Sequence, residues 1–294
     1  MAELFVLGIA VVDFVMRVES LPRQATKYRA DAAEVVGGGC ATNAAVAIAR
    51  LGGHAKLAAR LGDDALGEVI LADLQAMGVS TEHIQRTLGG RSSFSSILVD
   101  SRGERQIVNF RGSGLSDDIG WLDRIGPADA VLVDPRWQEA AHRALMMARD
   151  WNVPGVLDAD PPFDTQLLHA ASHVALSREG LHTLTDIEDT AAALEAVASD
   201  CPGWICVTDG AHGVFYADKA GIAHIPAFDV PVKDTTAAGD IWHGAFALAL
   251  AEGRPEAEAI RFANATAALK CMEFGGRAGA PDRPTVDRFF KERT

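Results

Sequence analysis

Apolar runs of strand length recur along the chain, separated by segments whose apolar residues follow helical spacing. The runs lie at residues 4–12, 130–134, 153–157, 173–176 and 204–208, and two of the helical segments lie at 138–151 and 186–199. A run that is apolar at nearly every position is typical of a strand buried on both faces, as in a parallel sheet. The alternation therefore predicts an α/β protein whose central, mostly parallel sheet is flanked by helices.

Two segments break this pattern because they alternate polar and apolar residues. Residues 26–36 and 91–110, the second with a turn at 101–103, predict antiparallel strands of a small separate sheet. We expect a lid formed by roughly 14–36 and 91–112 to close over a site on the main sheet. The exposed face of this lid is expected to pair with a second copy of the chain, which predicts a homodimer.

The composition is that expected of one α/β domain over residues 1–294. Hydrophobic residues make up 48% of the 294, enough for a large core, and neither a repeat nor a low-complexity linker interrupts the chain. Residues 241–270, rich in Ala and other helix formers, predict two packed helices joined near 253–255.

Charge and cysteine content argue against several classes of protein. The formal net charge of −13 is spread along the chain, so nucleic acid is not an expected partner. The N-terminal apolar run meets Asp13 and Arg17 well before membrane-spanning length, so we expect neither a signal peptide nor an anchor. The four cysteines show no CxxC spacing, which argues against a zinc site and predicts reduced thiols in a cytoplasmic protein.

The sharpest chemical signal is the segment 234–240 (DTTAAGD), which leads directly into an apolar helical stretch. Small residues before a helix leave backbone N–H groups exposed at its N-terminus, where the macrodipole also favours negative charge. Asp240 would lie beside an anion bound there, close enough to accept a proton from an attacking hydroxyl. The alternative is that Asp240 and Thr236 only cap the helix.

A second glycine-rich turn, 37–43 (GGGCATN), leads into a helix of small residues. Glycines let a ligand approach the backbone closely, and the Asn43 side chain offers both a donor and an acceptor to sugar hydroxyls. The spacing is not the GxGxxG of a dinucleotide-binding fold, and the chain contains no GxxxxGKS/T phosphate loop. An NAD-dependent dehydrogenase is therefore set aside.

In this order, the two segments make the chain resemble the ribokinase (PfkB) family of sugar kinases over essentially its whole length. The resemblance implies a ribokinase-like fold and transfer of a phosphoryl group from ATP, with Mg²⁺, to a sugar hydroxyl. It places the anion hole at Ala237, Ala238 and Gly239 and the catalytic base at Asp240.

The same resemblance assigns ligand contacts in the first half of the chain. Gly38, Gly39 and Asn43 would bind the sugar, together with Asp13, which follows the first predicted strand. The alternative for Asp13 is a turn residue at the end of that strand.

For the nucleotide, residues 208–213 (TDGAHG) resemble the T-x-G-x-x-G loop of the family. The resemblance places Thr208, Gly210 and Gly213 beside the ATP phosphates and ribose. The alternative is an ordinary strand, turn and strand.

Three further residues are assigned by resemblance alone. Asn264 matches a family position near the adenine, and Gly276 lies in a loop that resembles the one closing over the base. That loop flanks a monovalent-cation site in the family, so K⁺ is a candidate cofactor and Asp234 a candidate ligand to it.

Two positions depart from the family pattern. Members usually carry an N-x-x-E motif that helps to order Mg²⁺ and the phosphates, whereas residues 177–180 read SREG. Either water and other groups replace the missing side chains in ordering Mg²⁺, or Glu179 takes their role. The altered motif also leaves a non-enzyme alternative, a nucleotide-binding regulator without activity. The intact Asp240 argues against that alternative. Ala237 replaces a commoner glycine, and its added methyl is expected to leave the N–H groups accessible.

Arg136 is the residue that indicates the kind of substrate. It follows the predicted strand 130–134 at its carboxyl end, where open α/β sheets bind ligands. Its fork of donors suits a carboxylate, a sulfonate or a phosphate. Segments such as 26–28 (TKY) and 135–137 (PRW) resemble the sulfofructose kinases, which phosphorylate the 1-hydroxyl of 6-deoxy-6-sulfofructose. That resemblance implies that Lys27, Asn109 and Arg136 bind the sulfonate.

Several alternatives stay open for the substrate. Lys27 and Asn109 could be surface residues of an edge strand without a binding role, while Arg136 pairs with a nearby carboxylate. A kinase for 2-keto-3-deoxygluconate would also employ Arg136, and kinases of the fructokinase or ribokinase type act on neutral sugars.

Overall fold

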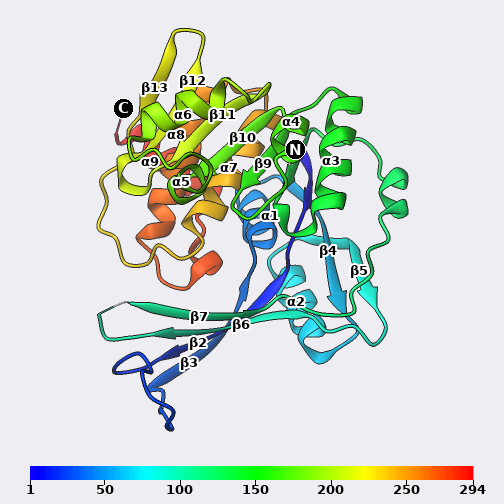
Figure 1. Ribbon diagram of the computed structural model, residues 1–294, viewed down its shortest axis with the longest axis vertical. Coiled ribbons are helices and arrows are strands. Elements are labelled where there is room, and N and C mark those ends of the chain that lie inside the picture. The colour runs from blue at the N-terminus through cyan, green and yellow to red at the C-terminus, as the bar shows by residue number, and fades with distance from the viewer. Residues whose placement is uncertain (103, 294) are drawn as a thin grey trace.

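The computed structural model describes residues 1–102 and 104–293. The strands of its large sheet are β1 (Glu3–Leu7), β4 (His54–Gly62), β5 (Ser80–Thr87), β8 (Ala130–Val133), β9 (Gly155–Ala159), β10 (His173–Ser177), β11 (Trp204–Thr208), β12 (Val214–Asp218) and β13 (Gly221–Ile225). They lie in the order β13-β12-β11-β10-β9-β8-β1-β4-β5 (Figure 1). All neighbours from β11 to β5 are parallel, and only β12 and β13 pair antiparallel. The predicted mostly parallel sheet is confirmed.

Helices cover both faces of this sheet. One layer contains α1 (Cys40–Arg50), α2 (Ala65–Ala76), α7 (Ala238–Ala251), α8 (Glu256–Cys271) and α9 (Arg283–Lys291). The other contains η1 (Gly120–Arg124), α3 (Gln138–Trp151), α4 (Gln166–Ala170), α5 (Arg178–Thr185) and α6 (Thr190–Ala198). Leu4 and Val6 of β1 face the first layer, and Phe5 and Leu7 face the second, as the two-residue period of a strand requires.

The chain leaves the large sheet much earlier than the apolar run predicts. A single strand over 4–12 is wrong, because β2 (Val11–Arg17) belongs to a second sheet. The change of direction follows from Asp134, whose buried carboxylate accepts the backbone N–H of Ile9 at 2.8 Å. Asp13 is therefore not a residue after the first strand but the third residue of a strand in the lid.

The lid is a four-stranded sheet in the order β3-β2-β6-β7, set apart from the large sheet in Figure 1. Its other strands are β3 (Ala32–Gly38), β6 (Ser93–Val99) and β7 (Arg105–Phe110). The outer pairs are antiparallel as predicted, but β2 and β6 are parallel, since two helices and two strands of the main body lie between them in sequence. Residues 26–31 are irregular, and Gly103 of the predicted turn lies outside the described residues.

Helices α1 and α7 cross at very short range. A Cβ on Gly244 of α7 would lie 2.4 Å from the backbone carbonyl oxygen of Ala44 in α1. This crossing fixes Asn43, the neighbour of Ala44, relative to the first turn of α7. Helix packing therefore sets the geometry of the site described below.

No helix in residues 1–102 or 104–293 is long and apolar enough to cross a membrane.

Candidate active site

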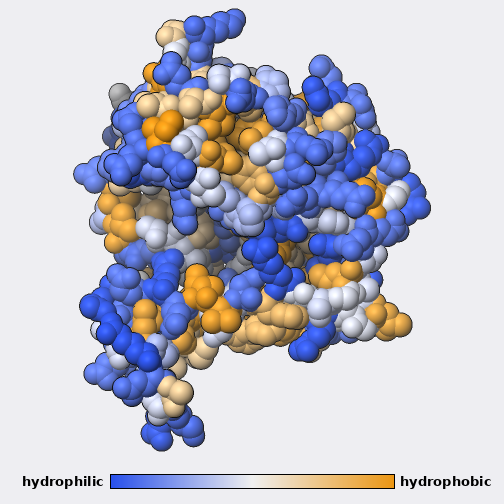
Figure 2. Space-filling model, viewed as in Figure 1, coloured by the Kyte–Doolittle hydropathy of each residue, from blue (hydrophilic) through white to orange (hydrophobic). Residues whose placement is uncertain are grey.

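Two hollows meet at the N-terminus of α7. One, of about 640 Å³, lies between the lid and the main body and is visible from the side in Figure 2. The other, of about 600 Å³, is lined entirely by residues between Thr208 and Cys271. Ala237, the N-cap of α7, lines the first hollow and Gly239 lines the second, so the start of α7 faces both.

The first turn of α7 has the free donors that an anion hole needs, although Ala238, one of the residues assigned to it, is not among them. The N–H of Ala238 donates to the Thr235 carbonyl at 3.1 Å, whereas the N–H groups of Gly239 and Asp240 have no partner within the described residues. Ala237 has a φ of 63°, a left-handed conformation that strains any residue with a Cβ. The commoner glycine at this position is thus explained by backbone strain as well as by space.

Asp240 is the residue around which the glycine-rich segment 37–43 gathers. The amide of Asn43 donates a hydrogen bond to its carboxylate at 2.7 Å. A Cβ on Gly38 would lie 2.1 Å from the carboxylate of Asp13, so only glycine lets that acid approach the backbone. The structure therefore brings Asp13, Gly38, Asn43 and Asp240 together, with Gly39 as the N-cap of α1 at a φ of 100°.

Electrostatics hold the pKa of Asp240 above its usual range. Burial raises this pKa, hydrogen bonds from Asn43 and Cys40 lower it, the charge of Asp160 raises it, and the charge of Arg136 lowers it. A base whose pKa lies above the ordinary aspartate value accepts a proton more readily. The influence of Arg136 also places that side chain in the same site as Asp240.

A pH dependence follows from this balance. The base must be ionised, so activity is expected to fall as pH drops through the raised pKa of Asp240, and the acidic limb of kcat/KM lies above the ordinary aspartate pKa of about 3.9. Asn43→Ala removes the hydrogen bond that lowers this pKa most, so the limb should move to higher pH. A pH–rate profile of both proteins tests this, and an unmoved limb would contradict the assignment of Asn43 as the donor.

Sequence reasoning missed three groups behind Asp240. Ligand atoms of Cys40, Asp158 and Asp240 lie within 4.8 Å of one another, and Nδ1 of His243 lies 3.4 Å from the Asp158 carboxylate. Burial, reinforced by the charge of Asp240, raises the pKa of Asp158 well above its usual range, and burial lowers the pKa of His243 to about 4. Asp240 therefore has a second buried carboxyl, that of Asp158, close behind it. Asp158 could have been found, because it follows a predicted strand as Arg136 does.

The second hollow has the composition of a nucleotide site. Thr208, Gly210 and Gly213, the residues assigned to the nucleotide, line it, and no residue of the lid strands does. Much of the remaining lining is apolar, including Val214, Ala227, Phe228, Val230, Trp242 and Ala268. An apolar slot that ends at free backbone N–H groups suits a flat base joined to phosphates.

Two residues assigned to the nucleotide form hydrogen bonds with other parts of the protein. Asn264 lines the hollow, but its amide accepts from the Trp242 indole at 2.8 Å and donates to the Pro226 carbonyl at 3.1 Å. Gly276 lines the hollow under the lid instead, and its N–H donates to the carboxylate of Asp234 at 3.2 Å. The Asn264 side chain thus lines the second hollow while bonded within the protein, and Gly276 lies outside that hollow.

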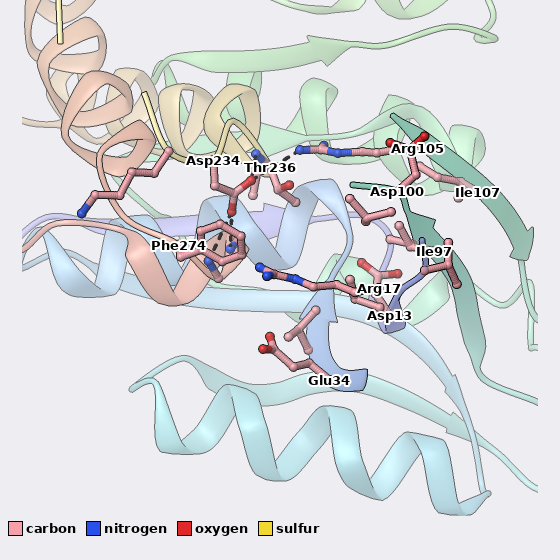
Figure 3. Close-up of a pocket in the computed structure, with 18 of the residues that line it drawn as sticks. Asp13, Arg17, Glu34, Ile97, Asp100, Arg105, Ile107, Asp234, Thr236 and Phe274 are labelled. Atoms are coloured by element: carbon pink, nitrogen blue, oxygen red, sulfur yellow. Dashed lines mark hydrogen bonds and ion pairs between the residues drawn. The ribbon is translucent and has the colours of Figure 1, made fainter. Parts of the chain in front are cut away.

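Asp234 is enclosed by donors. Thr236, Gly275 and Gly276 donate backbone N–H groups to its carboxylate, Lys270 adds an ammonium and Arg105 reaches it from the lid at 3.4 Å (Figure 3). Burial raises the pKa of Asp234, but hydrogen bonds, above all from Thr236, outweigh burial and hold it well below the usual range. The carboxylate is therefore ionised and fully engaged.

Arg136 lies at the other end of the site, beside a small hollow of about 120 Å³ that it shares with Arg60 and Arg111. It forms an ion pair with Asp160 and donates to the Pro161 carbonyl at 3.2 Å. Arg60, which sequence reasoning missed, stacks on Trp137 with its guanidinium carbon 4.4 Å from the ring centre. The sequence offered no clear signal for it, because Arg60 lies in a half-polar strand that also carries His54 and Lys56.

Lys27 and Asn109 are placed differently from each other. Asn109 lies on β7 and donates to the hydroxyl of Ser95 at 3.1 Å, and Ser95 in turn hydrogen-bonds Asp13. Lys27 lies in the irregular connection between β2 and β3, exposed at the far tip of the lid. One chain by itself therefore does not bring Lys27 to Arg136.

The segment that replaces N-x-x-E is a helix start. The hydroxyl of Ser177 accepts the N–H of Gly180 at 3.0 Å as the N-cap of α5, and Glu179 is exposed. Burial raises the pKa of Asp160, the charge of Arg136 lowers it, and the charge of Glu179 raises it again. Two carboxylates that interact in this way are oxygen ligands of the kind that Mg²⁺ prefers.

Taken together, a base at a helix N-terminus between a sugar-sized cleft and an apolar nucleotide pocket defines a phosphotransferase with an alcohol group as acceptor. Comparison with known proteins agrees, since residues 1–283 match the model of the pfkB family carbohydrate kinases. The chain is 30% identical to a ribokinase of Bacillus subtilis over 99% of this chain and 100% of that protein. It is also 30% identical to an ATP-dependent ribose-1-phosphate kinase of Halopiger xanaduensis, over 96% and 95%.

A solved structure shares the fold over nearly its full length. The putative ribokinase of Agrobacterium tumefaciens superposes with a TM-score of 0.92 at 36% identity, covering 99% of this chain and 98% of the other. This chain belongs to the pfkB family of carbohydrate kinases. The ribokinase-like fold with its lid is confirmed.

Proposed function

We propose that this kinase phosphorylates a small sugar that carries an anionic group, with 6-deoxy-6-sulfofructose, converted to its 1-phosphate, as the best candidate. The observation that carries the proposal is the set of three arginines, Arg60, Arg111 and Arg136, around one small hollow beside the site. A neutral sugar offers no charge to offset them. A sulfonate, a carboxylate or a phosphate does.

The charge balance of that hollow supports an anionic ligand. Arg60 pairs with Asp117 and Arg136 with Asp160, whereas Arg111 has neither an ion pair nor a hydrogen bond among the described residues. The side chain of Asp160 is 45% exposed, so solvent already weakens its hold on the 15% exposed guanidinium of Arg136. Arg111 is therefore the arginine of this hollow that has no ion-paired carboxylate among the described residues, and its guanidinium can bind an incoming anion.

The mechanism follows from the positions around α7. Asp13 and Asn43 would hold sugar hydroxyls, and Asp240 would take the proton of the hydroxyl that attacks the γ-phosphorus of ATP. The free N–H groups of Gly239 and Asp240, with the dipole of α7, would stabilise charge on the transferring group. Bound Mg²⁺ neutralises phosphate charge, and Asp160 and Glu179 are the carboxylates that would hold it.

A substrate panel tests the choice of sugar. ADP release should be measured with sulfofructose, fructose, fructose 6-phosphate, ribose, adenosine and 2-keto-3-deoxygluconate under identical conditions. We expect the highest kcat/KM with sulfofructose. Strong turnover of ribose without turnover of sulfofructose would overturn the substrate while leaving the kinase assignment intact.

Arg136→Met is expected to change selectivity more than overall activity. Loss of a charged donor costs about 10- to 100-fold in kcat/KM for the sulfonated sugar, corresponding to one strong charge-assisted contact, and little for fructose or ribose. Arg143→Met is the matched control, because Arg143 of α3 is a partly exposed arginine that pairs with Asp123 of η1. Equal losses on charged and neutral sugars would show that Arg136 has only a structural role.

Ribose is the second candidate substrate, because the relative from Bacillus subtilis is a ribokinase. We also propose that two chains pair through their lids. The lid exposes Val35, Ile107 and Val108, and the outer edges of its edge strands β3 and β7 pair with no other strand of the described chain.

A further inference from the structure

The amine of Lys270, at the end of α8, is completely buried next to the active site. The side chain has 0% exposure and ranks among the largest fully buried side chains of the protein. Its Nζ donates to the backbone carbonyl of Asp234 at 2.7 Å, to the carboxylate of Asp234 at 3.1 Å and to the carbonyl of Glu273 at 3.5 Å. A buried ammonium persists only where such partners offset its lost hydration.

These three oxygens are the ligands that a monovalent cation would take. Alkali cations bind backbone carbonyls and carboxylates in place of their hydration shell, and an ammonium carries the same single charge with three donors. Each of the three donors of Lys270 has an acceptor here. The residues present therefore do not fit an added K⁺ at Asp234, because its oxygens are taken and the two positive charges would repel each other.

The position of this charge matters for catalysis. Asp234 begins the loop that ends in the anion hole at the start of α7, and Glu273 begins the loop that leads to η4 (Gly276–Gly279). The lid contacts the same two loops, through Arg105 on Asp234 and through Arg17, whose guanidinium lies 4.8 Å from the ring centre of Phe274. One positive charge thus joins the anion-hole loop to the loop on which the lid rests.

We propose that Lys270 is a built-in substitute for a monovalent cation, so that phosphoryl transfer by this protein does not require K⁺. The proposal rests on the proposed function of the site as a kinase centre. It assigns to Lys270 a positioning role, since the side chain acts through the loop of Asp234 and does not touch the substrates.

Two variants of Lys270 separate this role from that of a simple buried ion pair. Lys270→Ala removes the charge and leaves space beside the three oxygens, whereas Lys270→Met removes the charge and fills the space. We expect the wild type to have the same kcat/KM in KCl and in choline chloride of equal ionic strength. In choline chloride, the kcat/KM of Lys270→Ala should be at least about tenfold below that of the wild type, because the anion hole is misplaced, and KCl or NH₄Cl should restore most of it. The kcat/KM of Lys270→Met should fall by the same factor, and neither salt should restore it.

Thermal unfolding without substrates gives a second readout that does not depend on the sugar. KCl should raise the melting temperature of Lys270→Ala by several degrees over choline chloride, and leave the wild type and Lys270→Met unchanged. Activation of the wild type by K⁺, or an Ala variant as indifferent to K⁺ as the Met variant, would overturn the proposal. If the Lys270→Ala protein does not fold, the proposal is tested by the wild type alone, whose kcat/KM must not depend on K⁺. Failure of every sugar in the panel would refute the proposed function and leave the melting comparison valid.

Discussion

Replacing Asp240 by asparagine is expected to lower kcat by about 10²–10⁴-fold while the protein keeps its fold and its affinity for ATP and sugar. The amide has the shape of the carboxylate and can still accept the hydrogen bond that Asn43 donates at 2.7 Å. It cannot take a proton from the attacking hydroxyl. Single-turnover phosphorylation and isothermal binding of each substrate measure the two effects separately.

The same variant decides between catalysis and helix capping. Asparagine caps a helix as well as aspartate does, so a purely structural Asp240 would tolerate the change in every assay. The N-cap of α7 is Ala237, which also argues that capping is not the task of Asp240. Turnover near that of the wild type would remove the base from the mechanism.

Gly244→Ala is expected to cost about 1 kcal/mol of unfolding free energy and, through the site, about 10²-fold in activity. A methyl 2.4 Å from a backbone oxygen cannot be relieved by a side-chain rotation, so α1 must retreat by about 1 Å. Overpacking of this kind costs about 1–3 kcal/mol, and the better helix propensity of alanine returns about 1 kcal/mol. The retreat carries Asn43 away from Asp240, and misplacement by about 1 Å is enough for a 10²-fold loss.

Gly239→Ala is the matched control for stability, because it makes the same change in the same helix where no atom lies within 4 Å of the new Cβ. Its unfolding free energy should stay level or rise by up to about 1 kcal/mol. Urea unfolding of the three proteins provides the comparison. A Gly244→Ala protein as stable as the control would show that the α1–α7 crossing has room to adjust.

The parts of the fold predicted from sequence are those that depend on local pattern. The helix expected at 138–151 is α3 (Gln138–Trp151), and the buried runs at 130–134 and 204–208 are central strands. Strand β4 escaped notice because it is apolar on one face only, with Lys56 and Arg60 on the strand. Period alone does not reveal that a half-polar segment lies inside a parallel sheet.

The errors have non-local causes. The run 4–12 is broken after β1 by a hydrogen bond between Ile9 and Asp134, which are 125 residues apart. The parallel pairing of β2 with β6 and the contact of Cys40 with Asp240 likewise join distant parts of the chain. Motifs within one turn or loop were recognised, whereas the acids and arginines around them could be placed only once the strands were ordered.

The separate linings of the two hollows have a kinetic consequence. The nucleotide pocket takes no residue from the lid strands, whereas the hollow beneath the lid includes Asp13, Gly37 and Ile107 of those strands. We therefore expect ATP and ADP, bound in that pocket as proposed, to exchange with the lid in either position, whereas the sugar and its phosphate should depend on lid opening. The two products would then leave by independent routes, and spent nucleotide could be replaced before the phosphorylated sugar is released.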